Sequence, residues 1–143
     1  MSLKEVAESL PKAIVTPEEI EYIQRACEKV DPTVRKEFEK RLMQWNQAIK
    51  SEPAMLLSND THDYAKQPQF AALVEMGEEI IPLVLDKLCD EENFHVLILY
   101  DALQEDATKR IEYSEDDVRV LEGEQNRARR TIKQWVEKTK GNQ

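Results

Sequence analysis

Residues 32–49 read PTVRKEFEKRLMQWNQAI, and this stretch decides the fold class. Its apolar residues recur at spacings of four, four, three and four: Val34, Phe38, Leu42, Trp45 and Ile49. Because residues three or four apart share one face of an α-helix, the spacing predicts an amphipathic helix. Asp31 before Pro32 supplies an N-cap and a proline at the first helical position, and Pro53 ends the pattern.

The sequence before this stretch predicts another helix. Residues 16–19, Thr-Pro-Glu-Glu, have the capping-box pattern with a proline where the missing N–H costs nothing. Apolar residues then follow at helical spacing: Ile20, Ile23, Cys27 and Val30. We therefore expect a helix from Thr16 to the Asp31-Pro32 pair, and an arm or short helix over residues 1–15.

After a polar connection over residues 54–67, Pro68 opens a third predicted helix. Its apolar face comprises Phe70, Leu73, Val74 and Met76, and Gly77 is a natural C-terminal stop. A fourth helix follows at once, with Ile80, Ile81, Val84, Leu85 and Leu88. Pro82 is tolerable there only in the first turn.

The run Val96-Leu97-Ile98-Leu99-Tyr100 is compatible with a buried strand or a buried helix, since periodicity does not separate the two in short apolar runs. No partner strand is evident, so we predict a fifth helix over about 93–104. Residues 105–117 are polar and acidic and are interpreted as a loop. The last helix is predicted over about 115–139, with one face formed by Val118, Leu121, Gln125, Ala128, Ile132 and Trp135.

Length and composition agree with an all-α domain. The chain has 143 residues, of which 41% are hydrophobic and 34% charged, enough for one packed core. Its 3 Gly and 6 Pro supply few of the residues that tight hairpins need. We predict six or seven helices in antiparallel pairs, as a short stack or an irregular bundle, with a single domain over 16–139 and a tail over 140–143. The predicted core includes Phe38, Trp45, Phe70, Leu85, Leu97 and Trp135.

The formal net charge of -9 disfavours nucleic acid, because the mean field of the chain repels a polyanion. One basic cluster comprises Arg127, Arg129, Arg130 and Lys133. We interpret it as a helix end whose cations complement the negative pole of the helix dipole, in preference to a phosphate-binding patch.

Cys27 and Cys89 sit beside apolar helical positions and have no metal-ligand spacing, so we expect buried free thiols and a reducing compartment. No segment has the length of apolar sequence typical of a signal peptide or a membrane helix. These features predict a cytoplasmic protein that does not enter a membrane.

The segment from Pro68 to Leu88 resembles the HEAT-repeat-like part of small bacterial helical proteins. The residues that carry this resemblance are Gln67-Pro68-Gln69-Phe70, Leu73-Val74-Glu75-Met76-Gly77 and Ile81-Pro82-Leu83-Val84-Leu85 with Leu88. The chain departs from the pattern after Leu103, where Gln104-Glu105-Asp106 replaces the Thr-Gly common in such proteins. The resemblance implies a scaffold of stacked helices that binds protein, and it carries over no catalytic residue.

Two enzyme hypotheses compete with protein binding. His62-Asp63 is similar to the metal-binding pair of phosphohydrolases, but residues 1–61 contain no further histidine. Glu75 and Glu78 have the spacing by which all-α nucleotide phosphohydrolases bind magnesium, although Gly77 lies between them. We therefore predict no metal, no cofactor and no catalytic residue, and keep the magnesium-dependent phosphohydrolase as the alternative.

The connection over 54–67 is the predicted functional surface, because loops of this length are uncommon in compact helical domains unless they are functional or disordered. The side chains proposed for contact are Asn59, Asp60, His62, Asp63 and Tyr64. A plain connector with a local cap is the competing interpretation. The predicted function is an adaptor or regulator that binds another protein, with homodimerisation left open.

Overall fold

The computed structural model describes residues 14–52, 61–105, 109 and 124–141. Within these ranges the chain is helical and has no β-strand, which confirms the all-α prediction. The described α-helices are α2 (Pro17–Glu28), α3 (Pro32–Ser51), α5 (Pro68–Val74), α6 (Ile81–Leu88), α7 (Leu97–Leu103) and α8 (Glu124–Gly141). Three 3-10 helices join them: η1 (Thr61–Lys66), η2 (Glu78–Ile80) and η3 (Glu91–Val96).

The caps of α2 and α3 confirm both predicted helix starts. The Thr16 hydroxyl accepts a hydrogen bond from the Glu19 N–H at 3.2 Å, and the Glu19 carboxylate accepts one from the Thr16 N–H at 2.9 Å. Asp31 caps α3 by accepting a hydrogen bond from the Thr33 N–H at 2.8 Å. These caps satisfy backbone donors that have no partner within the helix, so local sequence sets where each helix begins.

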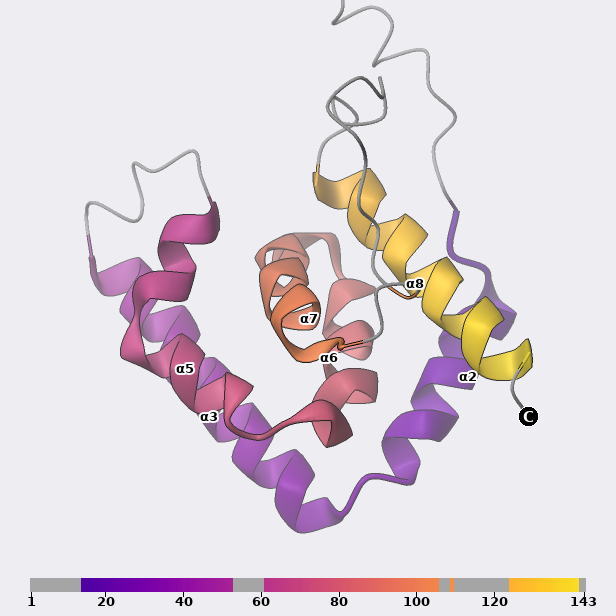
Figure 1. The fold of residues 1–143 in the computed structure, drawn as a ribbon, viewed down its shortest axis with the longest axis horizontal. Helices are drawn as coiled ribbons and strands as arrows, with labels where there is room; N and C mark the ends of the chain where they lie inside the picture. Colours follow the sequence, from indigo (N-terminus) through magenta and orange to yellow (C-terminus); the bar gives the residue numbers. More distant parts are fainter. Residues whose placement is uncertain (1–13, 53–60, 106–108, 110–123, 142–143) are drawn as a thin grey trace, which may run out of the picture.

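The helices form a bundle around α6 and α7 (Figure 1). In that view α2 and α3 are the two arms of a V, and α6 and α7 lie between the arms. α5 runs back along α3 as an antiparallel partner, and α8 lies beside α2. Because α6 contacts α2, α7 and α8, it is the central helix of the described fold.

The core follows the predicted apolar faces with one exception. Five of the six predicted core residues are buried: Phe38, Trp45, Leu85, Leu97 and Trp135. The sixth, Phe70, is only half-buried. Its ring packs against Trp45 from the edge of the core, with ring centroids 5.4 Å apart. Phe70 was predicted as a core residue, and it lies instead at the edge of the core, partly buried and packed against it.

Gly77 separates the helical segment of α5 from that of η2 and α6, as predicted. Its φ of 79° and ψ of -172° lie in a region that residues with a Cβ rarely adopt. Pro82 lies in the first turn of α6, where the absence of its N–H leaves no helical hydrogen bond unmade. This turn lets α5 and α6 leave the glycine in different directions.

The apolar run Val96–Tyr100 is helical, which resolves the choice between helix and strand. All five of its residues are buried. The helix begins differently from the prediction, because residues 91–96 form the 3-10 helix η3 and only Leu97–Leu103 is α-helical. Asn93, with φ of -104° and ψ of 18°, departs from helical geometry inside η3.

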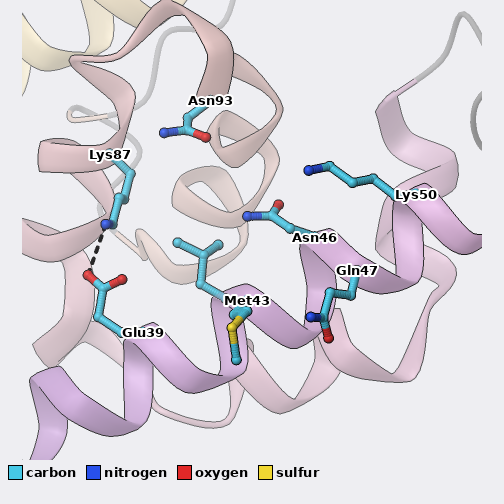
Figure 2. Close-up of a pocket in the computed structure, with 8 residues that line it drawn as sticks. Glu39, Met43, Asn46, Gln47, Lys50, Lys87 and Asn93 are labelled. Carbon is cyan, nitrogen blue, oxygen red and sulfur yellow. Dashed lines mark ion pairs between the residues drawn. The ribbon is translucent and has the colours of Figure 1, made fainter.

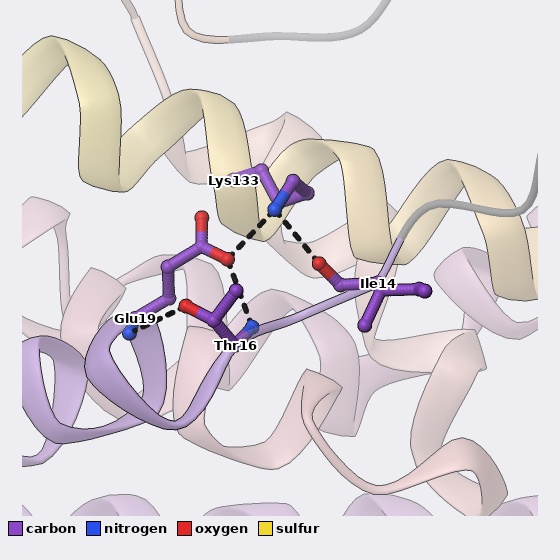
Figure 3. Close-up of polar contacts among 4 residues, drawn as sticks. All are labelled: Ile14, Thr16, Glu19 and Lys133. Carbon is purple, nitrogen blue, oxygen red and sulfur yellow. Dashed lines mark hydrogen bonds and ion pairs between the residues drawn. The ribbon is translucent and has the colours of Figure 1, made fainter.

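The basic cluster does not form a helix end, so that interpretation was wrong. Arg127, Arg129, Arg130 and Lys133 lie in the first turns and the middle of α8, whose last turn holds Lys138 and Lys140. Arg127 instead pairs with Asp101 at 2.8 Å. Lys133 donates to Glu19 and to the carbonyl oxygen of Ile14, both at 2.7 Å (Figure 3). Carboxylates on neighbouring helices therefore account for two of the four cations.

The buried face of α8 includes Ala128, Ile132 and Trp135, as predicted. The helix ends at Gly141, slightly beyond the expected end at residue 139. Residues 1–13 of the predicted arm over 1–15 lie outside the described residues, as do Val118, Leu121 and most of the acidic loop over 105–117.

Candidate functional site

A polar groove of about 360 Å³ lies between α3 and the α6–η3 segment (Figure 2). Its lining residues on α3 are Glu39, Leu42, Met43, Asn46, Gln47 and Lys50, and its other wall consists of Lys87 and Asn93. Residues far apart in the sequence thus meet at one surface. We call this surface the α3 groove.

The groove results from the position of α3 against the rest of the bundle. One face of α3 is buried through Phe38, Leu42, Trp45 and Ile49. The groove residues follow one another along the flank next to that face, at positions 39, 43, 46, 47 and 50. At one end, Lys87 reaches across from α6 and pairs with Glu39 at 2.9 Å (Figure 2). At this end of the groove, the charges of Lys87 and Glu39 therefore neutralise each other.

Three polar side chains of the groove have no hydrogen-bond or ion-pair partner within the described residues: Gln47, Lys50 and Asn93. Each carboxamide offers two donor hydrogens and an acceptor oxygen, and the lysine offers three donors. A peptide group also carries one donor and one acceptor. The α3 groove therefore presents hydrogen-bonding groups that match a polypeptide backbone.

Met43 adds an apolar contact in the middle of this polar lining. Its side chain is 55% exposed, and it is one of two large hydrophobic side chains exposed in the described part of the chain. Thioether side chains are flexible and polarizable, and they adapt to differently shaped partners. An exposed methionine beside free carboxamides is a chemically mixed surface of the kind found in protein-binding sites.

The inner wall of the groove is held by a half-buried histidine. His95 Nε2 lies 2.9 Å from Asn46 Oδ1, and the His95 ring packs 5.3 Å from Trp45 and 6.3 Å from Tyr64, between centroids. Burial lowers the pKa of His95 from 6.5 to about 4. The ring is therefore neutral at pH 7, and its Nε2–H donates to the Asn46 oxygen. This hydrogen bond leaves the Asn46 amide NH₂ directed to the groove (Figure 2).

The predicted loop surface over 54–67 is only partly a loop, because residues 61–66 form η1. Asn59 and Asp60 lie outside the described residues, as do the side chains of His62 and Asp63. Tyr64 is half-buried, faces His95, and its carbonyl oxygen accepts a hydrogen bond from Trp45 Nε1 at 3.1 Å. Tyr64 therefore supports the inner wall behind the α3 groove.

The sequence reasoning missed the α3 groove, although one signal pointed to it. Between Glu39 and Lys50, both charged and exposed, the flank of α3 carries the uncharged side chains of Met43, Asn46 and Gln47. A break in a charged helix face can mark a contact surface. Its second wall could not be inferred, because it depends on how α6 and η3 pack against α3.

The carboxylates considered for magnesium do not share one helix. Glu75 is the C-cap residue of α5, and Glu78 begins η2 on the other side of Gly77. The positive φ of that glycine breaks the spacing that would put two carboxylates on one face. Across the described residues, no group of three or more His, Cys, Asp or Glu side chains is placed to hold a metal ion.

Both cysteines are free and half-buried. The Cys27 thiol donates to the carbonyl oxygen of Pro82 at 3.2 Å, and the Cys89 thiol donates to that of Leu85 at 3.4 Å. Burial raises the pKa of Cys27 to about 12 and that of Cys89 to about 11. Both thiols are therefore protonated at neutral pH, which suits packing and disfavours nucleophilic chemistry.

Comparisons with protein-family models, with curated proteins and with solved structures found no match to this chain. Among the described helices, none is both long enough and apolar enough to cross a membrane. The candidate site therefore rests on the geometry of the chain itself.

Proposed function

We propose that the chain is a protein-binding helical module, an adaptor or regulator, that takes an extended segment of its partner into the α3 groove. The observation that carries this proposal is the set of unpaired polar groups on Gln47, Lys50 and Asn93 beside the exposed Met43. In the free protein these groups are solvated at an open surface. A partner peptide would exchange that water for backbone hydrogen bonds and cover the thioether.

The charges of the groove favour an acidic residue in the partner segment. Glu39 already neutralises Lys87, whereas Lys50 has no carboxylate partner in the described part of the chain. A carboxylate close to Lys50 would form a charge-assisted hydrogen bond, which is stronger than one between neutral groups. The expected ligand is therefore an extended peptide with a small apolar residue for Met43 and an acidic residue for Lys50.

The test is selection of peptides from a phage-displayed random library on the immobilised protein, followed by fluorescence anisotropy with the labelled peptides. We expect enrichment of acidic sequences whose affinity falls roughly tenfold in Lys50→Glu, because one charge-assisted hydrogen bond is replaced by repulsion. Met43→Ser should weaken the same peptides. Both positions are exposed, so neither substitution should disturb the fold.

The matched control is Lys138→Glu, which makes the same charge change at an exposed position of α8. It should leave the affinity unchanged. If the selected peptides bind Lys50→Glu and Met43→Ser as tightly as the wild type, the α3 groove is not the binding surface. The HEAT-like stacking implied by residues 68–88 stays a separate prediction.

A further inference from the structure

A second hollow, of about 370 Å³, lies between α2 and α8, away from the α3 groove. Its lining residues are Tyr22, Arg25, Ala26 and Lys29 of α2, and Lys140 of α8. Three of these five side chains are cations. The chain has 29 acidic and 20 basic residues, yet the described residues that line this hollow include three cations and no carboxylate.

No carboxylate in the described part of the chain pairs with either lysine of this hollow. Within the described residues, Lys29 has no side-chain hydrogen bond or ion pair, and the contact of Lys140 is with an aromatic ring. Arg25 pairs with Glu21, but its side chain is 71% exposed and its guanidinium has further donors. The hollow therefore has excess positive charge with donors available to a ligand.

Placement of cations near helix C-termini is the simpler explanation, because Arg25, Lys29 and Lys140 all lie near such ends. At the C-terminal end of α2, backbone N–H groups already bond to carbonyl oxygens of the last turn. The Lys29 N–H donates to the Ala26 carbonyl oxygen at 3.2 Å, and the Val30 N–H donates to that of Cys27 at 3.1 Å. Two of the terminal carbonyls therefore have partners without the Lys29 ammonium group.

The wall of the hollow is a fixed aromatic ring. Tyr22 packs edge-on against the buried Trp135, with centroids 5.8 Å apart and planes at 62°. Lys140 Nζ lies 5.2 Å from the centroid of the Tyr22 ring. This cation–π contact holds the C-terminal lysine of α8 over the wall built by α2. Cations from two distant parts of the sequence are thereby brought to one hollow.

We propose that Arg25, Lys29 and Lys140 form, around Tyr22, a binding site for a phosphoryl group. A phosphate monoester carries close to two negative charges at neutral pH and three acceptor oxygens, which three surrounding cations can share. Arginine offers a planar fork of donors to such oxygens, and lysine acts as a point charge. The ring of Tyr22 and the methyl group of Ala26 would contact the organic part of a phosphate ester.

The test is a titration of the ¹⁵N-labelled protein followed by NMR, with inorganic phosphate and with phenyl phosphate as probes at constant ionic strength. Saturable shifts are expected for the amides of residues 22–29 and for the Trp135 indole. If phenyl phosphate binds more tightly than inorganic phosphate, the site is assigned to phosphate esters. If the two probes bind equally, the site is assigned to free phosphate. Acetate at the same concentration should cause no saturable shift, and an equal response to acetate would overturn the assignment to phosphoryl groups.

Variants connect the shifts to the cations. Lys29→Gln and Lys140→Gln should each weaken binding about threefold, as expected for loss of one exposed charge contact, and the double variant about tenfold. The exposed Lys138→Gln on α8 is the control and should bind as the wild type does. Wild-type affinity in the double variant, or shifts that do not saturate at these residues, would overturn the proposal.

Discussion

His95 Nε2 lies 2.9 Å from Asn46 Oδ1, although the two residues are 49 positions apart in the chain. This contact joins η3 to α3 directly behind the α3 groove. Because a carboxamide oxygen only accepts, the hydrogen bond runs from the Nε2–H of His95 to Asn46, and burial keeps the imidazole neutral. The shape of the candidate site therefore depends on one half-buried titratable group.

The first prediction concerns the pH dependence of stability. Burial lowers the pKa of His95 from 6.5 to about 4 in the folded protein, so between these values the unfolded chain binds more protons. The free energy of unfolding should therefore fall as pH decreases from about 6.5 to about 4, by about 2–3 kcal/mol from this residue. Urea denaturation of the wild type and of His95→Gln at several pH values measures the difference. Parallel curves for the two proteins in this range would contradict the prediction.

The second prediction concerns the partner of His95. Asn46→Ala removes the acceptor and leaves the Nε2–H of the half-buried His95 without it, which should cost about 1–2 kcal/mol in the free energy of unfolding. Gln47→Ala is the matched control, because it removes an exposed carboxamide from the next position of α3. That change should stay within about 0.5 kcal/mol of the wild type. Equal losses would mean that the His95 contact adds nothing specific.

The start of each N-terminal helix could be predicted because its cause is local. Thr16 with Glu19, and Asp31 with Thr33, make their cap bonds within three residues along the chain. The core faces followed for the same reason, since helical spacing alone groups their apolar residues. Local sequence did not predict that residues 91–96 form a 3-10 helix, where η3 packs against α6, α7 and α8.

The candidate site was less predictable than the fold, because its parts are brought together only by packing. No local sequence pattern relates Asn93 and Lys87 to α3, yet these two residues form the second wall of the α3 groove. Tyr64 was selected as a surface residue, and its ring instead faces His95. A sequence pattern can show which face of a helix is apolar, but it does not show which neighbour completes a groove.

The third prediction concerns the link between α8 and the start of α2. Lys133 donates to Glu19 and to the Ile14 carbonyl oxygen (Figure 3), and Glu19 is only 16% exposed. Burial opposes ionisation of Glu19, but its hydrogen bonds with Lys133 and Thr16 leave its pKa lowered from 4.5. This contribution to stability is therefore present above pH 4.5 and is lost as pH falls through the folded pKa.

Lys133→Met should lower the free energy of unfolding by about 1–2 kcal/mol at pH 7, since it removes two hydrogen bonds made by a charged donor. The loss should shrink at pH values where Glu19 is protonated. Lys138→Met, at an exposed position of the same helix, is the control and should have little effect. A loss that is the same at pH 7 and at acidic pH would show that the Glu19 contact is not its source.

The last prediction concerns Gly77, which separates α5 from α6. A Cβ added at this position meets no atom within 4 Å, so steric contact gives no reason for glycine. The reason is its backbone, with φ of 79° and ψ of -172°, which costs a residue with a side chain about 1–3 kcal/mol. Gly77→Ala should lower the free energy of unfolding by that amount in urea denaturation.

Gly141→Ala is the matched control. Gly141 also has no atom within 4 Å of an added Cβ, but it has no positive φ and lies at the end of α8. It should be neutral or slightly stabilising, since alanine favours the helix. If the two substitutions had the same effect, the conformation of Gly77 would not be what determines the turn.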